Sequence, residues 1–206
     1  MTKTLDEGVI KFKYNLKLSK ALESAHYIEL EKWRVILFKM NLIGEYPIEK
    51  VGYGNLSYRN KVLTTEFTIT GTQTGKHANL NGSHYTKITK CNLKKSTVEA
   101  NGPIAPSSET LTHYAIYSSN SQINAIFHVH DKILWDYMIS NNLESTSEAV
   151  SYGTEQMAKE ASDCIDNKSS GIFVMKGHQD GIIAYGNSIE EAGKMILGFF
   201  KKSRNQ

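Results

Sequence analysis

Three histidines are the residues of this chain whose types and spacing could do chemistry together. His128 and His130 lie two positions apart at the end of the apolar run "INAIFHVH". On a β-strand, residues i and i+2 project from the same face, so these two imidazoles are close enough to share one ion. His178 ends another apolar stretch, "GIFVMKGH", beside an expected turn. Three neutral imidazoles converging from two strands would bind a divalent transition metal, usually zinc, and an open fourth position would make the site catalytic.

Glu109 is the next candidate, because it follows "APSS" at an expected helix start. The helix dipole and the free backbone N–H groups favour an anion at this position. The alternative is an ordinary carboxylate at a helix N-terminus. The same N–H groups and the hydroxyls of Ser107 and Ser108 could also bind a phosphate.

Two glycine-rich turns, "GYGNLSYR" (52–59) and "GTQTGK" (71–76), are further candidates for phosphate binding. Each could cradle a phosphate or be only a tight turn between strands. Neither fits the pattern GxxxxGK[ST] opening a helix, since His77 follows Lys76, which argues against binding of a nucleoside triphosphate. The residues alone therefore indicate a metal-assisted enzyme acting on a small substrate that could carry a phosphate.

The elements that must position these residues alternate along the chain. Strand-like patterns occupy 8–16, 55–59, 65–70, 84–99, 122–130, 171–177 and 181–186, and helical patterns occupy about 22–40, 107–120, 131–140, 145–165 and 188–200. We find no linker, repeat or low-complexity block. The order predicts a single α/β domain over residues 1–206, with one central sheet layered with helices.

Composition narrows the class of protein. The formal charge is only +3, and much of it comes from the tail "KKSRNQ", so nucleic-acid binding has little support. No apolar run approaches the roughly 18 residues that a membrane span needs. The N-terminal stretch "MTKTLDEGVIKFKYNL" is too charged for a secretory signal. Cys91 and Cys164 form no disulfide framework, so a reducing cytoplasm is expected.

Five segments, in this order, resemble the class II aldolase/adducin family: "GYGNLSYR", "TITGTQTGK", "PSSETLTHYAIY", "AIFHVH" and "GHQDGIIAYGNSIEEA". The resemblance extends from about residue 30 to 200. It implies a three-layer α/β domain in which helices flank a central, mainly antiparallel sheet. It also implies a homotetramer with the site at a subunit boundary.

The resemblance implies that His128, His130 and His178 bind Zn²⁺, or another divalent transition metal, and that Glu109 is the catalytic acid/base. Glu109 would ligate the metal when substrate is absent. The phosphate of a small sugar substrate would be bound by Gly54, Asn55, Thr74, Gly75, Ser107 and Ser108. Because the second turn looks one residue longer than usual, Gly71 and Thr72 are the alternative to Thr74 and Gly75.

The implied activity is that of a zinc-dependent lyase, which cleaves or forms a carbon–carbon bond in a phosphorylated ketose through a metal-stabilised enediolate. Such a role for Glu109 calls for a pKa raised toward neutral by burial. A dehydratase or a 4-epimerase of a ketose phosphate would use the same site. A non-catalytic scaffold like the adducin head lacks the metal histidines, so their presence here argues against it.

Two departures from the family pattern bear on the specific reaction. Gln179 and Asp180 separate the third histidine from the glycine that usually follows it, and Asp180 is a candidate for a second polar group at the metal. Aldolases and epimerases of the family commonly take a tyrosine from a neighbouring subunit, often near the C-terminus, but this chain ends "FFKKSRNQ". The candidates to replace it are Tyr114, Tyr117, Tyr137 and Tyr152.

Overall fold

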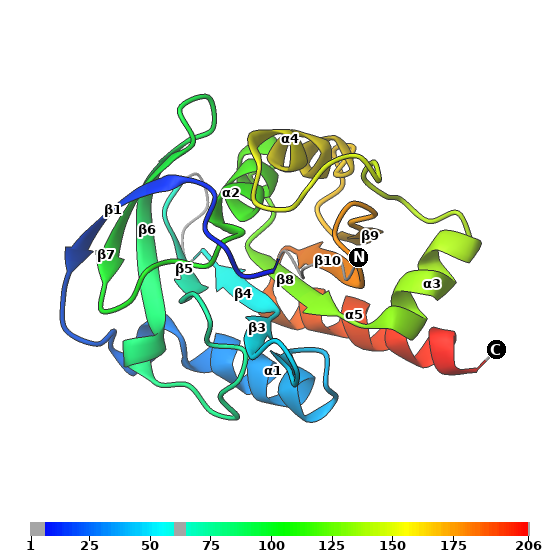
Figure 1. The fold of residues 1–206 in the computed structure, drawn as a ribbon, viewed down its shortest axis with the longest axis horizontal. Helices are drawn as coiled ribbons and strands as arrows, with labels where there is room; N and C mark the ends of the chain where they lie inside the picture. The colour runs from blue at the N-terminus through cyan, green and yellow to red at the C-terminus, as the bar shows by residue number, and fades with distance from the viewer. Residues whose placement is uncertain (1–6, 60–64, 206) are drawn as a thin grey trace.

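A computed structural model describes residues 7–59 and 65–205, and an eight-stranded sheet organises the fold of this part of the chain (Figure 1). The order across the sheet is β1 (Lys13–Leu18), β7 (Thr97–Gly102), β6 (Tyr85–Asn92), β5 (Phe67–Thr70), β4 (Asn55–Tyr58), β8 (Ala125–His130), β10 (Gly181–Gly186) and β9 (Gly171–Val174). Neighbouring strands are antiparallel except β1 and β7, which are parallel.

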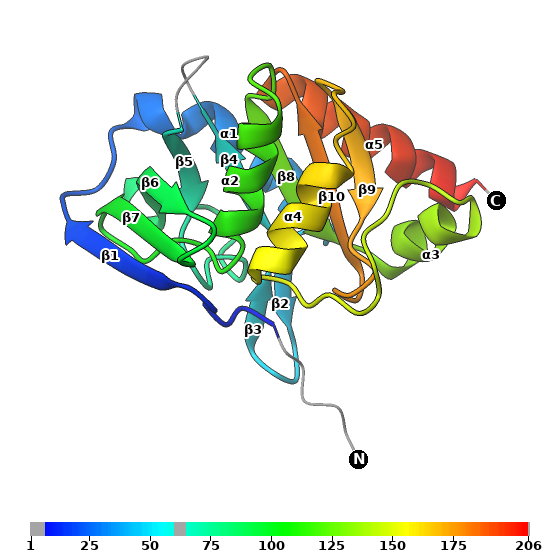
Figure 2. The same ribbon diagram turned by 90° about the horizontal axis from the view of Figure 1, so that it is seen from above.

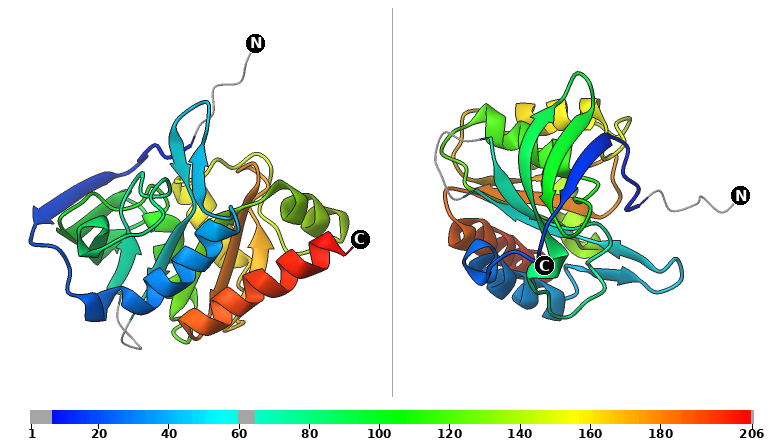
Figure 3. Two further views of the ribbon diagram at one scale, coloured as in Figure 1. Left: turned by 90° about the horizontal axis from the view of Figure 1, so that it is seen from below. Right: turned by 90° about the vertical axis from the view of Figure 1, so that its left-hand side faces the viewer.

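Helices cover both faces of this sheet. On one face lie α2 (Thr110–Ser119) and α4 (Glu155–Asp163), seen from above in Figure 2. On the other face lie α1 (Ile28–Lys39) and α5 (Ile189–Arg204), seen from below in Figure 3, and α3 (Lys132–Ser140) packs against α5 and β9. The predicted three-layer α/β fold with a mainly antiparallel sheet is confirmed.

The alternation of side chains along β8 explains why its sequence is apolar almost without a break. Ile126 belongs to the apolar core under α2 and α4, whereas Phe127 and Val129 belong to the core over α1 and α5. A strand covered on both faces buries every residue, so it loses the polar alternation of a half-exposed strand. His128 and His130 share the face of Ile126, which is the face toward α2.

Side-chain caps set several helix boundaries. Thr154 accepts a hydrogen bond from the backbone N–H of Met157, so α4 begins at Glu155 and not near 145 as predicted. Ser188 accepts from the N–H of Glu191 and starts α5, as predicted. The Asp131 side chain accepts from the N–H of Leu134 at the start of α3.

Other boundaries differ from the sequence prediction. The first strand is Lys13–Leu18 and not 8–16, and the first α-helix begins at Ile28, after a 3₁₀ turn at Ser24–His26. The helix predicted from 107 begins at Thr110, with Glu109 and neither preceding serine at its N-cap position. The small hairpin of β2 (Gly44–Tyr46) and β3 (Val51–Tyr53) was not predicted, since short strands leave little periodic signal.

Arg204, near the end of α5, clamps the residue that follows the histidine strand. Its guanidinium donates from two nitrogens to the two carboxylate oxygens of Asp131, at 2.8 and 2.6 Å. The two-pronged contact fixes the direction of the pair. It connects α5 to the end of β8.

Among the described residues, no helix combines the length and the apolar character that crossing a bilayer requires. The first six residues of the charged N-terminal stretch lie outside the described residues, as does Gln206 of the basic tail. Cys91 and Cys164 are both free thiols and both are buried.

A buried ion pair anchors α1 to the sheet. The Arg34 Nε donates to Glu31 Oε2 at 2.8 Å, and Arg34 also donates to the carbonyl of Ala78. Glu31 accepts in addition from the Tyr85 hydroxyl at 2.6 Å and from the Leu80 N–H at 2.7 Å. Removing one partner from such a network leaves the other buried and without compensation.

We therefore predict that Glu31→Ala lowers the free energy of unfolding by about 3–5 kcal/mol, because Arg34 and Tyr85 lose their common acceptor. Urea denaturation measures the change. The control is Glu29→Ala, which breaks an exposed pair with Lys32 on the same helix and should cost about 0.5 kcal/mol or less. Equal effects of the two substitutions would contradict the assignment.

Candidate active site

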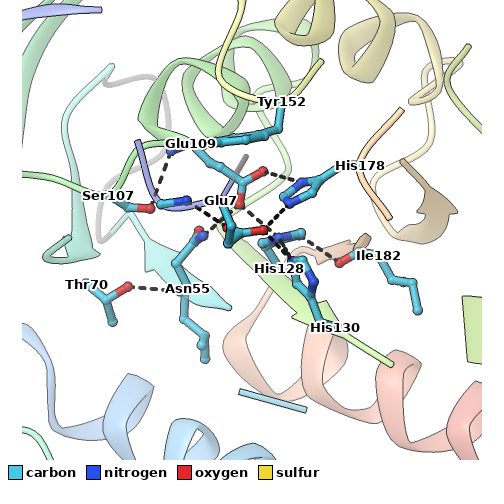
Figure 4. Close-up of polar contacts among 12 residues, drawn as sticks. Glu7, Asn55, Thr70, Ser107, Glu109, His128, His130, Tyr152, His178 and Ile182 are labelled. Carbon is cyan, nitrogen blue, oxygen red and sulfur yellow. Dashed lines mark hydrogen bonds and ion pairs between the residues drawn. The ribbon is translucent and has the colours of Figure 1, made fainter. Parts of the chain in front are cut away.

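The three histidines meet at one point in the fold (Figure 4). His128 and His130 come from β8, and His178 comes from the turn between β9 and β10. One ring nitrogen from each lies within 4.8 Å of the others, and all three side chains are buried. The Nε2 atoms of His128 and His130 are 2.9 Å apart.

Glu109 reaches this cluster from the N-terminus of α2. Its side chain is fully buried, with Oε2 2.9 Å from His128 Nε2 and Oε1 3.4 Å from His178 Nδ1. The Asn55 side-chain amide donates to Glu109 Oε2 at 2.7 Å. Asn55 lies directly opposite His128 in the β4–β8 ladder, so sheet register brings the amide, imidazole and carboxylate together.

Other contacts orient the imidazole rings. His128 Nδ1 lies 3.2 Å from the carbonyl oxygen of Ile182, an acceptor, so Nδ1 carries a proton there while Nε2 faces the cluster. The Tyr46 hydroxyl and His130 Nδ1 form a hydrogen bond of 2.9 Å. The ring of Tyr152 stacks on that of His178, with centroids 4.6 Å apart.

The cluster fits a divalent transition metal. Within the described part of the chain, Asn55 Oδ1 is buried here without a hydrogen-bond partner, and Glu109 Oε1 and His178 Nδ1 are paired only with each other, at 3.4 Å. Buried polar groups are otherwise almost always paired, so such a concentration points to a ligand. Three imidazoles with a carboxylate nearby are a usual zinc donor set.

The pKa of Glu109 departs from the prediction. Burial raises it, but the charges and hydrogen bonds of His128 and His178 outweigh burial and hold this pKa well below its usual range. The predicted rise toward neutral is therefore wrong for the arrangement of side chains found here. Glu109 is a carboxylate near neutral pH, suited to begin a reaction as a base.

Two of the clustered histidines have pKa values shifted in opposite directions. Burial lowers the pKa of His178, but hydrogen bonds to Glu109 and Glu7 outweigh it and raise this pKa to about 10. Burial and the neighbouring His178 and His128 hold the pKa of His130 well below its usual range. The two pKa values differ because the ring of His178 lies between two carboxylates and the ring of His130 does not.

The residues predicted to bind phosphate line one small cavity beside this cluster: Gly54, Asn55, Thr74, Gly75, Ser107 and Ser108. Gly71 and Thr72 line it as well, so the structure brings both alternatives of the second turn together. Gly54 has φ +79°, in the left-handed region that favours glycine. A Cβ at Gly75 would overlap the backbone oxygens of Gly44 and Tyr53, so only glycine fits this close approach.

Of the four tyrosines considered as replacements for the family's catalytic tyrosine, one lies at the histidine cluster and three lie elsewhere. Tyr152 lies at the cluster, whereas the Tyr117 hydroxyl hydrogen-bonds to Ser57 Oγ at 2.8 Å, within the core under α2. Tyr114 and Tyr137 are partly buried residues that pack against the two cores.

Among the described residues, the group of side chains close enough together to hold a metal ion consists of the three histidines and does not include Asp180. Asp180 has φ +62° and lines a surface cavity with Lys132 and Lys176. The inserted residues Gln179 and Asp180 therefore shape the surface behind the third histidine.

Sequence reasoning missed Glu7 and Tyr46, which both contact the histidines. Glu7 Oε2 lies 2.6 Å from His178 Nε2, although 171 positions separate the two residues. Neither residue falls in a motif or a periodic pattern, so nothing in the sequence singled them out.

Fold and site together define a class of protein. The family model described as Class II Aldolase and Adducin N-terminal domain matches residues 40–199, most of the chain, which therefore belongs to the class II aldolase/adducin family. A search of the curated proteins finds no match.

Several solved structures share the fold. L-fuculose-1-phosphate aldolase from Thermus thermophilus is similar with a TM-score of 0.64 and 19% identity, over 88% of this chain and 92% of that one. A sugar-phosphate aldolase from Thermotoga maritima has a TM-score of 0.65 and 17% identity, over 85% and 90%. An aldolase II superfamily protein from Pseudomonas syringae has a TM-score of 0.61 and 14% identity, over 91% and 75%.

The histidine cluster predicts stoichiometric metal binding. Purified protein should carry close to one equivalent of zinc per chain, measured by elemental analysis, and His128→Ala or His130→Ala should each remove it because two imidazoles hold the ion far more weakly. His26→Ala, which changes an exposed histidine, is the control. Metal retained in both site variants would refute the cluster as the binding site.

The hydrogen bond between Tyr46 and His130 predicts that Tyr46 influences zinc affinity without contacting the metal. Tyr46→Phe should weaken zinc affinity about 10-fold, because His130 loses the contact that orients its ring. Chelator competition measures the affinity. Tyr53→Phe is the matched control, since the Tyr53 ring also packs on His130 but its hydroxyl donates to the carbonyl of Asn41. The orienting role fails if both variants bind zinc as wild type does.

Proposed function

We propose that this protein is a zinc-dependent lyase that cleaves or forms a carbon–carbon bond in a small phosphorylated ketose. The observation that carries the proposal is the adjacency of two features. A cluster of three histidines and Glu109 lies next to a cavity lined by glycine backbone, Asn55 and the two serines before α2. Family membership supports an activity of the aldolase or epimerase type.

Each part of the site has a role in this proposal. His128, His130 and His178 would hold a divalent ion, and that ion would supply Lewis-acid stabilisation of negative charge at the substrate carbonyl. In bond formation Glu109 removes a proton from the carbon next to the carbonyl, and in cleavage it returns that proton. The amide of Asn55 holds Glu109 in place by donating to Oε2.

The cavity would bind the substrate phosphate. Ser107 and Ser108 precede α2, so the first N–H groups of that helix and its dipole favour an anion there. Residues 71–75 of the second turn line the same cavity. Holding the far end of the substrate orients the reacting carbons, which lowers the entropic part of the barrier.

A dehydratase or a 4-epimerase of a ketose phosphate is the alternative at the same site. A dehydratase would remove the acidic proton next to the carbonyl and expel the neighbouring hydroxyl as water, and a 4-epimerase would break and re-form the C3–C4 bond through the same enediolate. The non-catalytic scaffold is disfavoured by the buried histidines with their orienting partners. We also propose one catalytic domain over the whole chain, a homotetramer and a cytoplasmic location. The family resemblance supports the first two proposals, and the two free thiols support the third.

The test of the proposal is Glu109→Gln. This variant should keep its zinc and lose turnover by about 100-fold or more, because an amide accepts no proton from carbon. Wild type and variant are loaded with zinc and screened against a panel of ketose phosphates. Aldehyde release, loss of water and epimer formation are measured in the same samples.

The control is Glu99→Gln, which changes an exposed carboxylate on β7, far along the sheet from β8. Full activity of Glu109→Gln would remove its acid/base role. Formation of an epimer, or loss of water from the substrate, would show that the protein has the alternative activity and is not a lyase.

A further inference from the structure

The segment before β1 brings a second carboxylate into the histidine cluster (Figure 4). Glu7 Oε2 lies 2.6 Å from His178 Nε2 and 3.7 Å from His130 Nε2. Only 7% of Glu7 is exposed. A carboxylate this deeply buried requires compensation from charge or coordination.

Specific contacts hold the segment in this position. The backbone N–H of Val9 donates to the hydroxyl of Tyr152, whose ring stacks on His178. The side-chain amide of Gln73 donates to the carbonyl of Gly8 at 3.3 Å. Gly8 has φ +71°, in the left-handed region that favours glycine, so this path of the backbone suits the residue present. Glu7 is therefore positioned from both sides.

The Glu7 carboxylate lies close enough to the cluster to share a metal ion with the histidines. Bonds of about 2.0 Å in a tetrahedral site leave neighbouring ligand atoms about 3.3 Å apart. Glu7 Oε2 lies 3.7 Å from His130 Nε2, near that value, and its 2.6 Å hydrogen bond to His178 Nε2 would give way to the shared ion. Aspartate and glutamate oxygens are regular zinc ligands.

Glu7 and Gly8 also line the phosphate-binding cavity, together with Asn55 and Ser107. A substrate phosphate in that cavity would be next to the Glu7 carboxylate, and the two anions would repel each other. The Glu7 side chain therefore occupies space that the substrate phosphate needs.

We propose that Glu7 is a further ligand of the metal, and that the substrate must displace it. The inference rests on the proposed function, and it concerns a residue outside the motifs that identify the family. In this arrangement the chain supplies a carboxylate to the coordination position on the side of the cavity. A ketose phosphate replaces that carboxylate by its own oxygen atoms.

The experiment uses the full chain loaded with Co²⁺, whose visible absorption reports the number and kind of ligands. Glu7→Gln should change this spectrum and raise the metal dissociation constant about 10-fold or more in chelator competition. Dihydroxyacetone phosphate, added as a probe, should bind Glu7→Gln at lower concentration than wild type, because no carboxylate has to leave.

Glu23→Gln, which changes an exposed carboxylate near the start of α1, is the control and should match wild type in all measurements. An unchanged Co²⁺ spectrum in Glu7→Gln overturns the proposal, even if affinity falls, since Glu7 would then act on the ligands and not on the metal. Equal or weaker binding of dihydroxyacetone phosphate by Glu7→Gln overturns the displacement.

This outcome is distinguishable from failure of the proposed function. If wild type binds Co²⁺ through the histidines and Glu7→Gln leaves the spectrum unchanged, only the role of Glu7 is lost. If wild type and His128→Ala both bind no metal, the proposed function fails together with this inference.

Discussion

The register of β8 between β4 and β10 is the constraint on which the site depends. It sets His128 opposite Asn55 on one side and opposite Ile183 on the other. A slip of one residue would turn both histidines toward α1 and α5 and would put Phe127 and Val129 in their place. The backbone ladder and the two apolar cores therefore determine where the imidazoles point. The metal chemistry follows from that packing.

Within the site that this register creates, the neighbouring charges determine whether each imidazole and carboxylate is protonated. Three imidazoles and two carboxylates are buried together, at distances where none can be charged without affecting the others. Glu7 and Glu109 lie on either side of His178 and raise its pKa against the effect of burial, whereas burial and two neighbouring imidazoles lower the pKa of His130. A divalent cation among these groups would replace protons as the positive charge.

Most of the layers could be predicted from the sequence, and so could the residues that meet in the site. The paired histidines on a buried strand and a helix beginning close to Glu109 were visible as local patterns, although that helix starts at Thr110 and not at Ser107. Short elements were not, because the three-residue strands of the β2–β3 hairpin carry no periodic signal. Glu7 and Tyr46 reach the histidines through long-range packing. The pKa of Glu109 also depends on neighbours that become close only in the folded chain.

The burial of β8 on both faces has a consequence for changing what this protein acts on. Every side chain of that strand is enclosed, so a different size at any of its positions disturbs either a core or the histidine cluster. The turn at 71–76 is another matter, since Lys76 is exposed there and follows residues that line the cavity. Selection for new substrates, natural or in the laboratory, would find a tolerant position at Lys76, whereas Gln73 keeps its bonds to Gly8 and Gly52 and the strand stays as it is.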